Sequence, residues 1–197
     1  MFKKLLQFEV FYQLKQRAFP IFAILFLALG IFVGRQGFAP TGVNFNAVYQ
    51  VYFYTNIITL GSVFITMFFA ISAMLRDKQH NMESLIYSSS ITKAQYFWSR
   101  FAGTFIFSVF AFSPFLLGYF LGLTFSDLDP ARISDFQIMT YLQPWLYMVI
   151  PNIFICTTII FSVSTLTKSS TATYVSAIFI YMLYFVSSIF LNSPLMA

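Results

Sequence analysis

The sequence predicts an all-α polytopic transmembrane helix bundle, and three observations carry that prediction. Of the 197 residues, 59% are hydrophobic and 9% are charged, whereas average soluble domains have about 45–50% and about 25%. The mean hydropathy is +0.78. The apolar residues gather in long stretches, each close to the roughly 20 residues that a helix needs to cross a bilayer. These observations exclude a soluble globular domain and a disordered tail, and the single cysteine excludes a disulfide scaffold.

We expect helical spans because the apolar stretches are nonpolar on every face and lack the alternating polarity of barrel strands. Backbone groups in lipid must also be satisfied within the element, which favours helices. The chain is therefore interpreted as a single membrane domain, 1–197, with five spans at 18–34, 51–74, 102–123, 145–163 and 172–191.

The lysines and arginines predict the orientation. Nine of the eleven lie on one side of the expected membrane, before the first span or in the connections 75–101 and 164–171. Short loops rich in these residues stay cytoplasmic, so we expect a cytoplasmic N-terminus and an outside C-terminus for this chain. The formal charge of +5 thus reflects topology. No compact basic patch with interleaved aromatic residues indicates nucleic-acid binding.

The segment 1–17 precedes the first span and begins with an amphipathic pattern. On a helical wheel, one side carries Met1, Phe2, Leu5, Leu6 and Phe8, and the other carries Lys3, Lys4 and Gln7. The pattern fades after Glu9. A basic, aromatic-rich helix of this kind is typical of the membrane interface, with lipid as its partner. A frayed positive terminus is the alternative.

The connection 75–101 is too long for a tight turn. Asn81 can cap a short helix whose apolar residues share one face: Met82, Leu85 and Ile86. A run of three serines follows, and Thr92 and Gln95 then have the spacing of a capping box that starts the next helix. A short amphipathic helix of this kind docks into a groove of a soluble partner or lies on the lipid headgroups.

No Asp, Glu, Lys, Arg or His lies within the expected spans, which argues against an ion-coupled carrier. Uncharged hydroxyl residues recur along one helical stripe, which either lines a pathway or packs against another helix: Thr55, Thr59, Ser62 and Thr66. Two G-x-x-x-G motifs, at 30–34 and 118–122, permit close helix approach. Pro114 and Pro151 are expected to kink their helices.

No catalytic motif or metal-ligand cluster occurs in the sequence, so we expect neither enzyme activity, nor a metal site, nor a cofactor on this chain. An ATPase or peptidase activity would lie on another chain or beyond residue 197.

The arrangement resembles the membrane-spanning permease subunit of type 2 ATP-binding-cassette transporters. The residues that carry the resemblance lie in the connection 75–101: Arg76-Asp77-Lys78, Glu83 to Ser90, Ile91-Thr92-Lys93 and Tyr96 to Phe101. The resemblance implies an interfacial N-terminal helix and a cytoplasmic coupling helix that docks on an ATPase. The docking residues would be Met82, Glu83, Leu85, Ile86 and Tyr87, and ATP would bind to the partner.

More narrowly, 82–100 and the end of the chain are similar to the N-terminal part of long bacterial proteins that fuse a permease to a zinc aminopeptidase-like domain. The family's membrane unit has six spans, and this chain has the first five. We therefore expect that the natural product continues past Ala197 or that the sixth span is lost.

The resemblance implies the permease half of an ATP-driven exporter in the bacterial cytoplasmic membrane. It would pair with a second copy or a homologous permease half and take energy from a separate ATP-binding-cassette ATPase. Two other interpretations remain: a non-transporting scaffold or anchor of a larger assembly, and the membrane part of a longer enzyme fusion.

Overall fold

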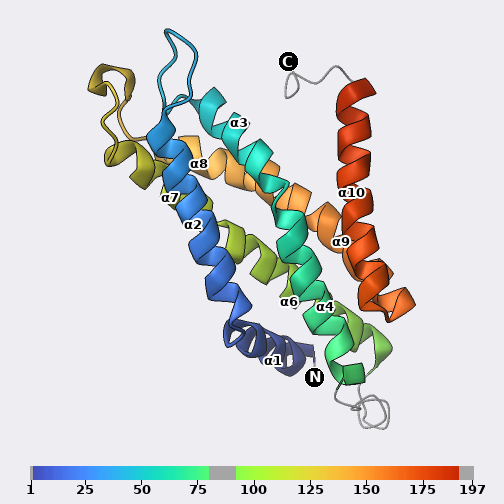
Figure 1. Cartoon of the computed structure of the whole chain (residues 1–197). Helices are drawn as coiled ribbons and strands as arrows, with labels where there is room; N and C mark the ends of the chain where they lie inside the picture. Colours follow the sequence, from blue (N-terminus) through green and yellow to red (C-terminus); the bar gives the residue numbers. More distant parts are fainter. Residues whose placement is uncertain (1, 80–91, 191–197) are drawn as a thin grey trace. The chain divides into compact units, whose positions relative to one another are not determined.

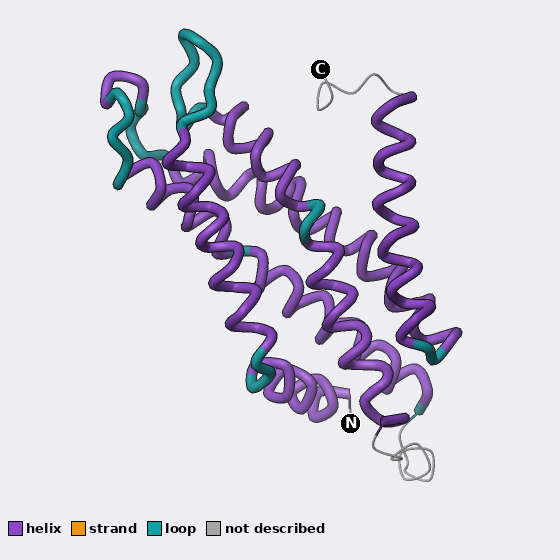
Figure 2. Tube along the Cα trace, in the orientation of Figure 1, coloured by secondary structure: helices purple, strands orange, loops and turns teal. Residues whose placement is uncertain are grey.

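The computed structural model describes residues 2–79 and 92–190 (Figure 1). Within these residues all regular secondary structure is helical (Figure 2). The α-helices are α1 (Phe2–Leu14), α2 (Ala18–Gln36), α3 (Val48–Thr59), α4 (Ser62–Gln79), α6 (Lys93–Phe112), α7 (Pro114–Thr124), α8 (Ile138–Pro144), α9 (Ile150–Thr167) and α10 (Ser170–Phe190). A 3₁₀-helix, η1 (Pro130–Arg132), and a π-helix, η2 (Trp145–Val149), complete the set.

Four helical segments in the described part of the chain are long and apolar enough to cross a membrane: Ala18–Gln36, Lys93–Thr124, Ile138–Thr167 and Ser170–Phe190. The number becomes five when α3 and the Ser62–Met74 part of α4 are counted as one broken span. The predicted all-helical, membrane-compatible fold is therefore confirmed, while the predicted count of five depends on this broken pair.

The prediction of one continuous helix over 51–74 is wrong, because α3 ends at Thr59 and α4 begins at Ser62, with Leu60 and Gly61 between them. Glycine weakens a helix interior, and the Thr59 hydroxyl bonds the carbonyl oxygen of Thr55 at 2.5 Å, a bond that tends to bend helices. The carbonyl oxygen of Leu60 instead accepts a hydrogen bond from the Tyr181 hydroxyl at 2.7 Å. The break is thus held by a side chain from α10.

The described helices fall into two compact units. The first contains α1, α4, α6 as far as Ser108, α9 from Ile153, and α10. The second contains α2, α3, the end of α6 from Val109, α7, α8, η2 and the first residues of α9. Each unit has its own contacts and is described by itself.

The first unit is held by an apolar core between α4, α6, α9 and α10. Its buried members are Val63, Ala70, Ala73, Phe101, Ile160, Phe161 and Ala177. The rings of Phe97 and Phe101 both meet Phe161 edge to face, with centroids 5.2 and 5.6 Å away. Edge-to-face aromatic pairs are favourable beyond the area that they bury.

The second unit depends on the close approach of α2 and α7. The glycines of both G-x-x-x-G motifs face one another there: Gly30, Gly34, Gly118 and Gly122. A Cβ atom added at Gly34 would lie 2.5 Å from the carbonyl oxygen of Tyr119, and one added at Gly122 would lie 2.5 Å from that of Ile31. Only glycine permits this backbone contact, so the predicted role of the motifs is confirmed.

Both predicted proline positions coincide with helix irregularities in the second unit. The helix is interrupted at Ser113, and α7 begins at Pro114. Before Pro151 the helix widens into η2, which relieves the clash between the proline ring and the preceding turn. The Trp145 indole donates a hydrogen bond to the Ser113 hydroxyl at 2.9 Å, so the two irregular sites are joined.

We predict that Gly30→Ala or Gly118→Ala lowers the free energy of unfolding by about 1–3 kcal/mol, because the added methyl group forces two backbones apart. Chemical unfolding of the purified protein in detergent measures the change. Ala28→Val enlarges an exposed position on the same helix and is the control. Equal stability of the glycine variants and the control would contradict the role of close α2–α7 packing.

Candidate functional site

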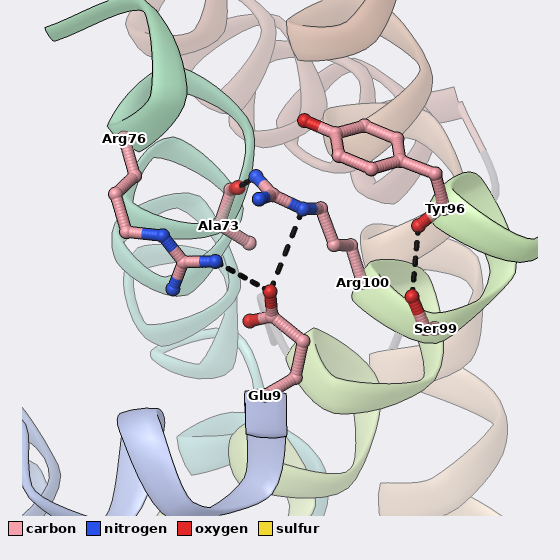
Figure 3. A network of polar contacts seen from close by, with 6 residues as sticks. All are labelled: Glu9, Ala73, Arg76, Tyr96, Ser99 and Arg100. Carbon is pink, nitrogen blue, oxygen red and sulfur yellow. Dashed lines mark hydrogen bonds and ion pairs between the residues drawn. The ribbon is translucent and has the colours of Figure 1, made fainter. Parts of the chain in front are cut away.

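A buried ionic cluster joins three helices of the first unit (Figure 3). Glu9 on α1 points between Arg76 on α4 and Arg100 on α6. One carboxylate oxygen, Oε1, lies 2.5 Å from Arg76 Nη2 and 3.5 Å from Arg100 Nε. The three residues are 3%, 9% and 4% exposed, respectively. We call this set of three residues the Glu9 clamp.

Other groups complete the surroundings of the two guanidinium groups. Arg100 Nη1 donates a hydrogen bond to the carbonyl oxygen of Ala73 on α4. The Tyr12 ring lies 4.1 Å from the Arg76 guanidinium carbon, and the Tyr96 ring lies 4.3 Å from that of Arg100. Charge-assisted hydrogen bonds and cation–π contacts offset part of the cost of burying these charges.

Gly103 allows α1 to come this close to α6. A Cβ atom at Gly103 would lie 3.2 Å from the Cβ of Glu9 and 3.5 Å from the amide nitrogen of Gln13. Glu9 and Gln13 are one helical turn apart, and both are buried. The side of α1 that faces the protein therefore carries an acid and an amide.

The helix α1 extends beyond the residues that carry the predicted amphipathic pattern of the segment 1–17. The helix continues to Leu14, and its two buried residues are Glu9 and Gln13. Phe2 and Phe8, expected on one apolar side with Leu5 and Leu6, are 40% and 58% exposed, while the two leucines are half-buried. An interfacial helix would present such exposed apolar side chains to lipid, so the interfacial interpretation stays a prediction.

The two arginines of the Glu9 clamp lie near the end of α4 and near the start of α6, on either side of the segment 80–91. Arg76 is in the last turn of α4, and Arg100 is two turns into α6. Both helices that lead into and out of the segment 80–91 are therefore held by a single carboxylate on α1.

The start of α6 follows the sequence prediction in part. The Thr92 hydroxyl accepts a hydrogen bond from the backbone N–H of Gln95 at 3.3 Å, which is one half of the predicted capping box. The other half is not formed, since the side-chain oxygen of Gln95 has no hydrogen-bond partner in the described part of the chain. The predicted docking residues of the preceding helix lie outside the described residues: Met82, Glu83, Leu85, Ile86 and Tyr87.

The predicted hydroxyl stripe is divided between two helices. Thr55 and Thr59 lie on α3, and Ser62 and Thr66 lie on α4, on either side of the break at Leu60 and Gly61. All four side chains are at most 2% exposed. The Thr66 hydroxyl donates to the carbonyl oxygen of Ser62 at 2.8 Å, as Thr59 does to Thr55. Both interpretations of the stripe remain predictions.

The second unit holds an aromatic-lined cavity of about 380 Å³ that the sequence did not predict. It is lined by Phe38, Ala39, Pro40, Tyr49, Gln50, Phe53 and Tyr54. The Tyr54 hydroxyl donates to the carbonyl oxygen of Phe38, and Arg132 donates to those of Pro40 and Val43 at 2.8 and 2.7 Å.

Among the described residues, no cluster of three or more His, Cys, Asp or Glu side chains is placed to hold a metal ion. Comparison of the chain with family models, with curated proteins and with solved structures finds no match.

Sequence reasoning counted Arg76 and Arg100 toward the topology and the family resemblance, paired neither with an acid, and did not assign Glu9 a role. The available signal was a lone acid in an otherwise basic segment, followed by an amide four residues later. That spacing places both polar groups on one side of a helix, where they require partners if the side is buried.

We predict that Glu9→Gln lowers the free energy of unfolding by about 3 kcal/mol, because it leaves two buried guanidinium groups without a carboxylate. Chemical unfolding in detergent measures the loss. Asp127→Asn removes an exposed carboxylate and is the matched control. If the two variants unfold at the same denaturant concentration, the clamp does not hold α1 to the protein.

Proposed function

We propose that this chain is the permease half of an ATP-driven exporter, with energy supplied by a separate ATP-binding-cassette ATPase. The observation that carries the proposal is the Glu9 clamp, which ties α1 to both helices that flank the segment 80–91. In the proposed arrangement the segment 80–91 docks on the ATPase through Met82, Glu83, Leu85, Ile86 and Tyr87.

The clamp supports this function because an externally driven transporter must transmit movement mechanically. A docked segment that moves with the ATPase pulls on α4 and α6 together, since Arg76 and Arg100 share one carboxylate. ATP binding then shifts the population between inward-open and outward-open arrangements, provided that the ATPase binds the two with different affinity. No charged group within the expected spans offers an ion gradient as an alternative energy source.

The proposed complex contains two permease units, either two copies of this chain or this chain and a homologous half. It lies in the bacterial cytoplasmic membrane, with the N-terminus and the segment 80–91 in the cytoplasm and the C-terminus of this chain outside. Lipid covers the exposed apolar side chains of α2 and α10, which include Ile21, Ile24, Ile178 and Phe179. Substrate export follows from the family resemblance.

We predict that an ATP-binding-cassette ATPase co-purifies with the chain from native membranes in mild detergent and that Leu85→Asp with Ile86→Asp removes it. Two buried aspartates in an apolar docking face would lose their hydration without a partner. Mass spectrometry identifies the partner, and ATP hydrolysis by the purified complex verifies it. The wild-type level of the variant in the membrane shows that insertion is unaffected.

Ser88→Asp with Ser89→Asp adds the same charge to the same segment and leaves its apolar residues in place. We expect this control to keep the ATPase. Recovery of wild-type protein without any ATPase, or equal recovery with both double variants, would reject the docking assignment and favour a scaffold.

We predict that Lys93 and Asp129, both exposed, lie on opposite sides of the membrane. Single cysteines at these positions, in a Cys156→Ser background, are reacted with a membrane-impermeant maleimide in intact cells. Cysteine at 129 should react from outside, and cysteine at 93 only after the membrane is permeabilised. Labelling of both from the same side would overturn the orientation.

A further inference from the structure

The exposed side of α1 combines basic and apolar side chains. It carries Lys3, Lys4, Phe8, Phe11 and Leu14, and Lys15 directly follows the last residue of the helix; all six are exposed. Phe8, Phe11 and Leu14 are 58%, 63% and 53% exposed. At about 100° per residue these positions share one broad side of the helix, away from Glu9 and Gln13. Phe8 is at the edge of this side, since the centroid of its ring lies 5.4 Å from the guanidinium carbon of Arg76.

The acid of α1 does not face the same way as its lysines. Glu9 is the only acid in the segment 1–17, and its carboxylate is buried between Arg76 and Arg100. The exposed side therefore presents three ammonium groups and no carboxylate. An acid on that side would have neutralised part of the charge and repelled anions.

We propose that this side of α1 binds the headgroups of anionic phospholipids. Phe8, Phe11 and Leu14 enter the boundary between headgroups and acyl chains, and Lys3, Lys4 and Lys15 extend their ammonium groups to the phosphates. The apolar residues favour a lipid surface over an acidic protein groove, because their rings can enter the acyl boundary while the flexible lysine stems carry the ammonium groups back to the headgroups.

The chain connectivity keeps this side near a membrane. Three residues, 15–17, separate α1 from α2, which is long and apolar enough to span a bilayer. A segment next to a span stays within a short distance of the headgroups. The proposal thus rests on the membrane location of the chain and is independent of the proposed ATPase partner.

The test uses the full chain in nanodiscs, with Cys156→Ser and an environment-sensitive fluorophore on Gln7→Cys, an exposed position of α1. The discs contain phosphatidylcholine with or without about 30% phosphatidylglycerol, and lipids with a quencher at the headgroup report proximity. We expect phosphatidylglycerol to increase quenching, and we expect about 0.5 M salt to reverse the increase by screening.

Neutralisation of the three lysines together, with Lys3→Gln, Lys4→Gln and Lys15→Gln, should abolish the response, since each lysine near an anionic surface contributes about fivefold in affinity. Lys93→Gln with Lys168→Gln lowers the net charge at exposed positions outside α1 and should keep it. Quenching that is the same in both lipids, or a response that survives in the triple variant, would overturn the proposal. A response lost equally in the control would do the same, because it would reflect net charge alone.

Discussion

The carboxylate of Glu9 imposes a constraint that much of the first unit satisfies. A buried carboxylate needs a positive partner, and two buried guanidinium groups need an anion, so none of the three side chains can move away alone. Their pairing requires α1 to lie against α4 and α6, and Gly103 removes the Cβ atom that would hold α1 away. It also fixes the rotation of α1, which turns Phe8, Phe11 and the lysines outward.

The helices of the second unit are held together by a different interaction. Glycines on α2 and α7 bring two backbones into contact. Van der Waals packing holds these two helices together, whereas an ion pair holds α1 in the first unit. Side chains then hold its connections through backbone carbonyls, as Arg132 does at Pro40 and Val43. Ion pairs thus hold α1 to the ends of α4 and α6 that flank the segment 80–91. Close packing holds the apolar helices α2 and α7, where a buried ion would be costly.

Local pattern predicted much of the fold. Composition and apolar length predicted the helices, the Thr92–Gln95 spacing predicted a cap, and the glycine motifs predicted close approach, because each depends on neighbours within one or two turns. Glu9 and Arg76 are 67 positions apart in the sequence, so the local pattern of α1 could not indicate which residue pairs with Glu9. The break at Leu60 and Gly61 was also missed, because an apolar window measures hydropathy and not the hydrogen bond that Tyr181 supplies to Leu60.

The buried ionic cluster is an expensive way to hold helices together, since well-packed apolar side chains of similar volume are often as stable or more so. An apolar contact would join α1 to α4 and α6, but it would tolerate rotation of α1 about its axis. A carboxylate that must meet two guanidinium groups tolerates much less. Rotation matters here because opposite sides of α1 do different things: one holds both helices that flank the segment 80–91, and the other presents three lysines. We therefore infer that the cluster is retained for orientation rather than for stability.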